Sequence, residues 1–172
     1  MKYFTPELFV RLQSSDADTA DKADEEWEGA LMRYRRRLDR IRSDLPRAAR
    51  HLAFDLQLHD AEVLSMAREN GRFVSVLRLS TPPARTVILT YRLAGEAKID
   101  RAALPSPYRS SEANWLYDEV DVVSGKKVYR HFILLSNGWQ LELHFRELSI
   151  FEADALLPSA HEVADSSAMQ PA

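Results

Sequence analysis

The sequence contains no cysteine, only five glycines and no apolar run long enough to cross a membrane. The absence of cysteine excludes disulfides, thiol nucleophiles and thiolate metal sites. The longest uninterrupted apolar run is Phe132 to Leu135, whereas a membrane-spanning helix needs about 20 apolar residues. The start of the chain also lacks the apolar core of a secretory signal. We therefore expect a cytoplasmic protein that does not insert into a membrane.

The motifs that identify common enzyme classes are missing as well. The chain has no G-x-S-x-G, no H-E-x-x-H, no dinucleotide fingerprint and no phosphate-cradling loop, and its glycines are all isolated. A formal net charge of −3 gives no overall attraction to nucleic acid. The length of 172 residues, with 45% hydrophobic and 28% charged residues, suits one compact domain. These features favour a binding protein over an enzyme.

The most informative stretch runs from Lys127 to Arg146, where two β-rich segments flank Asn137-Gly138. This dipeptide readily supplies two successive positive φ angles, which predicts a hairpin closed by a two-residue type I′ turn. In the register that such a turn sets, Leu134 faces Leu141 and His131 faces His144. The first strand is apolar on both sides, so we expect it to lie inside a sheet.

The same register predicts a group of polar residues with the composition of a metal or acid/base site. Glu142 lies one diagonal from the facing His131 and His144, and either Asp118 or Glu119 is expected beside His131, depending on the length of the preceding turn. Facing histidines on a half-exposed strand pair are more often surface residues, or residues satisfied by a carboxylate. We therefore expect no resident cofactor, and keep as the alternative a divalent metal held by His131, His144, Glu142 and Asp118.

The first third of the sequence is predicted to be helical. Thr5 and Pro6 form a helix start signal, and a longer helix is expected to begin between Asp16 and Asp21. The apolar residues of the longer helix are alternately four and three positions apart and form a heptad-like seam: Trp27, Leu31, Tyr34, Leu38, Ile41 and Leu45. We interpret this seam as packing within the same chain, with an intermolecular coiled coil as the alternative. A third, shorter helix follows Pro46.

An arginine cluster follows the acidic start of the longer helix. Residues Arg33 to Arg50 include eight arginines and two aspartates. Cations near a helix C-terminus complement the helix macrodipole, and Asp39 can pair with Arg36 and Arg42. Because no aromatic platform or known reading motif accompanies the arginines, we prefer this interpretation to nucleic-acid binding.

From Asp60 onward, short β-rich segments alternate with turn signals, including a second Asn-Gly at Asn70-Gly71. We predict an α+β fold, with two or three N-terminal helices packed on an antiparallel meander sheet of about five to seven strands. Residues 1–57 are expected to form the helical segment and residues 58–155 the sheet, within one cooperative domain. The composition of residues 156–172 predicts a disordered tail.

Four short segments resemble a bacterial family known only as a domain of unknown function, the family numbered four thousand and eighty-five. They are the opening Met1-Lys2-Tyr3-Phe4-Thr5, Leu58-His59-Asp60-Ala61, Trp115-Leu116-Tyr117-Asp118-Glu119-Val120 and Leu135-Ser136-Asn137-Gly138. The resemblance implies a cytoplasmic bacterial protein with a helical start and a β-rich end, and it carries no assigned activity. It also implies a shared role for His59, Asp60 and Trp115.

The leading functional hypothesis is a small non-enzymatic interaction module, immunity-like in kind, that binds a partner protein. It would bind through its sheet face or through the irregular loop between Pro105 and Ala113. The candidate binding residues are Trp115, His59, Asp60 and Tyr108. One alternative is a metal-dependent hydrolase centred on His131 and His144. A second is a helical module that self-associates as a homodimer.

Overall fold

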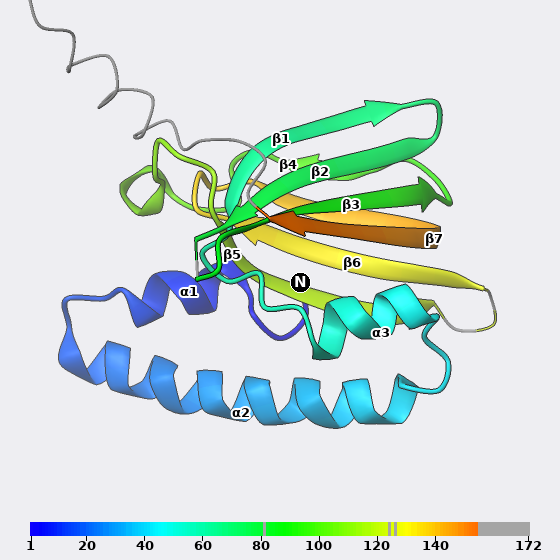
Figure 1. Cartoon of the computed structure of the whole chain (residues 1–172). Coiled ribbons are helices and arrows are strands. Elements are labelled where there is room, and N and C mark those ends of the chain that lie inside the picture. Colours follow the sequence, from blue (N-terminus) through cyan, green and yellow to red (C-terminus); the bar gives the residue numbers. More distant parts are fainter. Residues whose placement is uncertain (81, 124, 126, 155–172) are drawn as a thin grey trace, which may run out of the picture.

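The computed structural model describes residues 1–80, 82–123, 125 and 127–154, and it shows an α+β fold with three N-terminal helices and an antiparallel sheet (Figure 1). The predicted fold class is therefore confirmed. The predicted tail, residues 156–172, lies outside the described residues. The elements in chain order are α1 Pro6–Leu12, α2 Ala17–Ile41, α3 Arg47–Phe54, β1 Glu62–Glu69, β2 Arg72–Leu79, β3 Arg85–Leu93, β4 Lys98–Asp100, a 3₁₀ turn Ser106–Tyr108, β5 Trp115–Val123, β6 Val128–Leu135 and β7 Gln140–Asp154.

The helices begin where their capping residues predict. Thr5 caps α1 by accepting a hydrogen bond from the Leu8 N–H, and Asp16 caps α2 by accepting one from the Thr19 N–H. The apolar seam of α2 packs within the molecule. Tyr34, Leu38 and Ile41 are buried in the core, and Trp27 and Leu31 pack against that core. The seam is therefore not free to form the coiled coil of the self-association hypothesis.

The sheet consists of two three-stranded meanders joined side by side. Its strand order is β1-β2-β3-β7-β6-β5, and the short strand β4, which the sequence did not predict, pairs with β7. Strand β7 joins the two meanders because its first half pairs with β6 and its second half with β3. The change of partner occurs at Phe145, which lies opposite both Tyr129 and Leu93.

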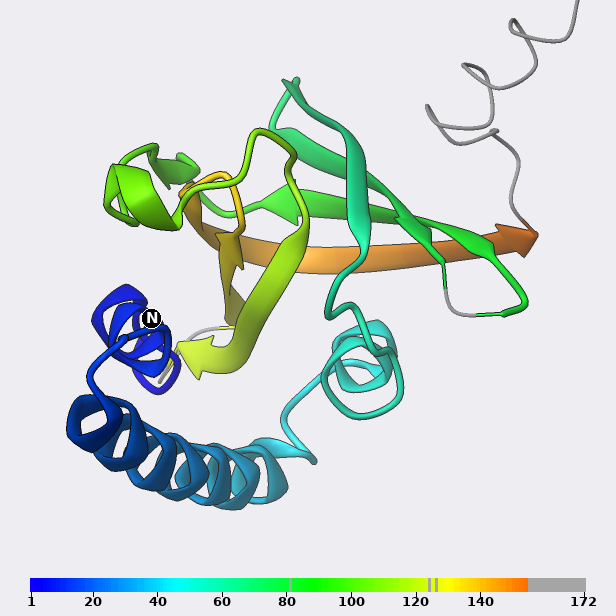
Figure 2. The ribbon, with the colours of Figure 1, turned by 90° about the vertical axis from the view of Figure 1, so that its left-hand side faces the viewer.

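The curled sheet brings its two outer strands together at one end. The Asp60 N–H donates to the Trp115 carbonyl and the Trp115 N–H to the Ala61 carbonyl, both at 2.8 Å. The Val63 N–H donates to the Ala113 carbonyl at 2.8 Å. These bonds join the start of β1 to the start of β5. All three helices lie on one side of the sheet, near β5 (Figure 2).

The two Asn-Gly dipeptides form different turns. At the first turn, Asn70 and Gly71 both have positive φ, and Glu69 pairs directly with Arg72, as a two-residue type I′ turn requires. At the second turn only Gly138 has positive φ, the Gly138 N–H donates to the Leu135 carbonyl, and the Leu135 N–H donates to the Trp139 carbonyl. This pattern is a three-residue loop, so the predicted two-residue turn at Asn137-Gly138 is wrong.

Contacts with the 103–114 segment account for the longer loop. Ser136 Oγ accepts from the Asn114 N–H at 2.8 Å and donates to the Glu112 carbonyl at 2.7 Å, so Ser136 belongs to the loop rather than to the strand. The Asn137 side chain accepts from the Trp139 N–H at 3.1 Å. The longer loop shifts the β6–β7 register by one residue and sends every side chain of one strand to the opposite face. Leu134 pairs with Gln140, and His131 pairs with Leu143.

Replacing Gly138 by Ala should destabilise the protein more than replacing Gly71 by Ala. Both glycines have positive φ, which costs a non-glycine residue about 1 kcal/mol or more. A Cβ at Gly138 would also lie 2.9 Å from the Arg109 side chain, whereas a Cβ at Gly71 would meet nothing within 4 Å. We expect a loss of about 2 kcal/mol for Gly138→Ala and about 1 kcal/mol for Gly71→Ala in urea unfolding. Equal losses would show that the Arg109 contact is unimportant.

Candidate functional site

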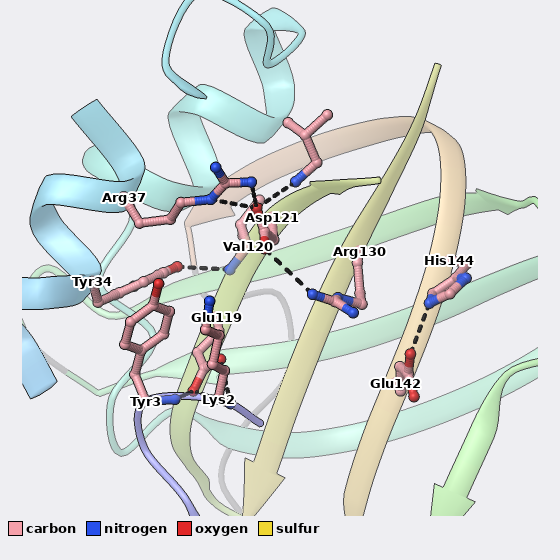
Figure 3. Close-up of polar contacts among 11 residues, drawn as sticks. Lys2, Tyr3, Tyr34, Arg37, Glu119, Val120, Asp121, Arg130, Glu142 and His144 are labelled. Atoms are coloured by element: carbon pink, nitrogen blue, oxygen red, sulfur yellow. Dashed lines mark hydrogen bonds and ion pairs between the residues drawn. The ribbon is translucent and has the colours of Figure 1, made fainter. Parts of the chain in front are cut away.

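The register shift separates the residues of the predicted metal site. His131 faces the interior with no exposed surface, whereas His144 lies on the opposite face of the sheet, across from Arg130. His144 Nε2 bonds to Glu142 at 2.7 Å, and the pair lies apart from the β5 side chains (Figure 3). Among the described residues, no three His, Asp or Glu side chains form a group that could hold a metal. The facing His131 and His144 that the hydrolase hypothesis requires are therefore not present.

Glu142 forms a small surface cluster instead. It lies between His144 and Lys98, whose ammonium is 3.1 Å from the Glu142 carboxylate. Partial burial would raise the pKa of Glu142, but the bonds from Lys98 and His144 together hold that pKa below its usual value. The carboxylate therefore stays ionised and paired, as in a structural ion pair.

His131 belongs to a polar network inside the curled sheet. Its Nε2 is 3.0 Å from an Asp118 carboxylate oxygen, and its Nδ1 is 2.9 Å from the Tyr91 hydroxyl. The indole N–H of Trp115 donates to the other Asp118 oxygen at 3.0 Å. Asp118 therefore lies beside His131, as one of the two carboxylates expected there. The residue directly paired with His131 on β5 is Val120, and Asp118 contacts His131 from the diagonal position two residues away.

The chemistry of this network fits a structural role. Burial, aided by the negative charge of Asp118, raises the pKa of Tyr91 far above its usual value, so the phenol keeps its proton. Tyr91 can then donate to His131 Nδ1 while His131 Nε2 donates to Asp118. This assignment satisfies each of these buried polar atoms. Because Tyr91, His131 and Trp115 have no exposed surface, a substrate cannot reach their side chains.

Three of the four candidate binding residues meet where the sheet closes. Asp60, which has a φ of 65°, bonds through its N–H to Trp115. The His59 ring stacks on Tyr117 and its Nδ1 is 2.6 Å from the Leu116 carbonyl. These contacts fix the segment that connects α3 to β1. The fourth residue, Tyr108, belongs to the separate 3₁₀ turn and is half-buried.

Three consecutive β5 residues connect the sheet to the helical part of the chain, a feature that the sequence did not reveal (Figure 3). The Glu119 carboxylate accepts hydrogen bonds from the backbone N–H groups of Lys2, Tyr3 and Phe4 at 2.7–3.0 Å. The next two residues bind α2: the Val120 N–H donates to the Tyr34 hydroxyl at 2.6 Å, and Arg37 donates twice to Asp121, at 2.9 and 2.6 Å. The periodicity of α2 indicated only its apolar contacts.

The face of β1, β2, β3 and β7 opposite the buried network carries a surface without charges. We call it the outer patch. It consists of two rows of residues that are directly paired across the four strands, namely Ser65, Val76, Ile88 and Phe151 in one row and Ala67, Val74, Thr90 and Ser149 in the other. Phe151 is 57% exposed, and the other seven residues range from half-buried to exposed.

Charged residues border the outer patch on both sides. On one side Glu62 and Arg78 form an ion pair, and on the other Arg92 and Glu147 do so. The strand pairing places these pairs in the rows next to the uncharged ones. Five of the eight residues are apolar and three carry hydroxyl groups. A mostly apolar centre with charged groups at its border is the arrangement found in protein–protein interfaces.

Comparison with known proteins gives no relative, since neither a family model nor a curated protein matches this chain. The resemblance to the family of unknown function therefore stays a prediction. No helix in the described part of the chain has both the length and the apolar character needed to cross a bilayer.

Tyr91→Phe should lower stability by about 1–3 kcal/mol, because it leaves a buried nitrogen of His131 without its partner. The matched control is Tyr129→Phe. The Tyr129 ring, like that of Tyr91, packs on Phe145, but its hydroxyl makes no hydrogen bond among the described residues. Urea unfolding of the two variants measures the difference. If both lose the same small amount, the buried network does not stabilise the fold.

Proposed function

We propose that this chain is a cytoplasmic protein-binding module and that the outer patch is its contact surface. The observation that carries the proposal is the pair of adjacent uncharged rows, with the Glu62–Arg78 ion pair beside one row and the Arg92–Glu147 ion pair beside the other. Apolar side chains gathered on one accessible face, without charges among them, mark interaction sites on proteins. The interior network gives a substrate no access, and the predicted metal residues lie apart, so binding accounts for the observed geometry better than hydrolysis does.

The size of the outer patch favours a different protein over a second copy of this chain. With strands about 4.8 Å apart and residues of one face about 7 Å apart along a strand, the eight side chains cover roughly 300 Å². A stable dimer buries about 800 Å² on each partner. The patch therefore has the size of an interface centre, and its partner must also contact the charged border. An apolar area of this size is typical of transient complexes with another protein.

Phe151→Asp should strongly weaken binding of the partner, because it puts a charge in place of the large exposed apolar side chain at the β7 end of the outer patch. The matched control is Ile99→Asp, which changes another large exposed apolar side chain, 41% exposed, on the separate strand β4. Proteins captured from native cell extract by the wild type would be purified, and their affinities measured with each variant. We expect affinity for Phe151→Asp to fall at least about 30-fold, as for an interface hot spot, and affinity for Ile99→Asp to change little.

Three results would contradict the proposal. The first is that no captured protein binds the wild type once both are purified. The second is an equal loss of affinity in Phe151→Asp and Ile99→Asp. The third is a doubled mass of the wild type in solution that Phe151→Asp returns to the monomer value, which would show that a second copy occupies the outer patch. Circular dichroism of both variants establishes that they remain folded.

A further inference from the structure

The arginine cluster between Arg33 and Arg50 is mostly free of ion pairs. Within the described residues, Arg37 is the only arginine of the cluster that contacts a carboxylate, that of Asp121. The expected pairs of Asp39 with Arg36 and Arg42 do not form. Ion pairs within the protein therefore do not neutralise the positive charge of the cluster, and most of its arginines are exposed.

These free arginines surround two recesses. The first, of about 720 Å³, lies between α2 and the start of the chain and is lined by Lys2, Arg33, Arg36 and Arg40 with a single acid, Asp39. Four cations and one carboxylate give this recess a strong positive potential, although the chain as a whole has a formal net charge of −3.

The second recess, of about 800 Å³, lies between α3 and β7. Arg42, Arg47, Arg50 and Arg146 contribute to its lining. Its acidic lining residues already have partners: Glu147 is bonded to Arg92, and Asp55 to His51. His51 also bonds to Glu152, and the bonds to Glu152 and Asp55 raise the pKa of His51, which favours its cationic form. This recess is therefore also strongly cationic.

A smaller recess connects the two. It shares Asp39 with the first recess and Phe54 with the second, and Arg35 contributes a further cation. The three recesses therefore follow one another across α2 and α3. We call the surface that these three recesses occupy the arginine track; Asp39 is the one acid in the lining of the first recess and of the smaller one. Such a surface fits an extended polyanion better than a single small anion.

The structure also supplies the stacking groups that the sequence lacked near the arginines. Tyr3, which is distant from the cluster in sequence, is half-buried in the first recess, and its ring packs against Tyr34. The ammonium of the exposed Lys2 lies over the Tyr3 ring, 5.4 Å from its centroid, so a base stacks there by displacing the Lys2 side chain. In the second recess the Arg42 guanidinium lies over the Phe54 ring, 4.6 Å from its centroid, so that it presents a supported flat surface. Aromatic rings and guanidinium planes are the surfaces on which unpaired bases stack.

We infer that the arginine track binds single-stranded nucleic acid. The free arginines contact successive phosphates, for which the guanidinium fork is well suited, and bases stack at Tyr3 and on the Arg42–Phe54 pair. A duplex keeps its bases stacked internally and cannot use the stacking groups. An acidic protein would use the charges but not the stacking groups. This inference does not depend on the proposed role of the outer patch.

The test compares two triple variants of equal net charge. The track variant carries Arg36→Gln, Arg40→Gln and Arg47→Gln. The control variant carries Arg68→Gln, Arg72→Gln and Arg101→Gln, three exposed arginines that line neither of the two large recesses. Fluorescence anisotropy with a short labelled oligothymidylate, between about 50 and 200 mM salt, gives the affinity and its salt dependence.

The wild type and the control variant should bind with the same salt slope. The track variant should bind more weakly, and the magnitude of its slope of log affinity against log salt should fall by about 2, because each lost phosphate contact to a single strand contributes about 0.7. Phe54→Leu should weaken binding of the single strand without changing the slope, and should leave duplex binding unchanged.

The inference is wrong if the wild type does not bind the oligothymidylate at about 50 mM salt. It is also wrong if the track and control variants lose affinity equally, or if polyglutamate competes as well as nucleic acid does. Stronger binding of duplex than of single strand would contradict the stacking role of Tyr3 and Phe54. Circular dichroism spectra identical to that of the wild type exclude unfolding as the cause of any loss.

Discussion

The fold depends on how the edge of β5 is covered. An edge strand exposes unpaired backbone groups, and this one also carries a nearly buried carboxylate, Glu119, which is 3% exposed. A buried charge is strongly unfavourable unless hydrogen bonds replace its water. The N–H groups at the start of the chain supply those bonds, while Tyr34 and Arg37 bind the next two residues of the strand. These three consecutive residues, 119–121, which we call the β5 strip, hold the helical third of the chain against the sheet.

This arrangement decides which surfaces remain for function. The helices cover the β5 side of the sheet, and the interior is filled by apolar residues around the Tyr91–His131–Asp118 network. On the described part of the chain, two exposed surfaces of distinct character stand out: the uncharged outer patch and the arginine track, which lies on α2 and α3. We propose a protein partner for the outer patch and a single-stranded nucleic acid for the arginine track. A molecule with both could hold a protein and a nucleic acid at once, although each proposal stands without the other.

The sequence predicted the elements better than their pairing. Helix starts at Thr5 and Asp16 and the turn at Asn70-Gly71 could be predicted because each depends on a few neighbouring residues. Asn137-Gly138 has the same local signal, but contacts of Ser136 with residues 112 and 114 select a longer loop. That single-residue shift separated His131 from His144. The arginine track was equally hidden, because Tyr3 reaches it only through the tertiary fold.

The most direct test of this account is amide hydrogen exchange of Glu119→Gln, which keeps the shape of the side chain but removes its charge and faces an NH₂ toward N–H donors. The account predicts that protection in α1 and α2 falls by about 3 kcal/mol of local opening free energy, while β2, β3 and β7 keep theirs. Unchanged protection in the helices, or an equal fall in the helices and in β2, β3 and β7, would contradict it, because the β5 strip would then not be what holds the helices to the sheet.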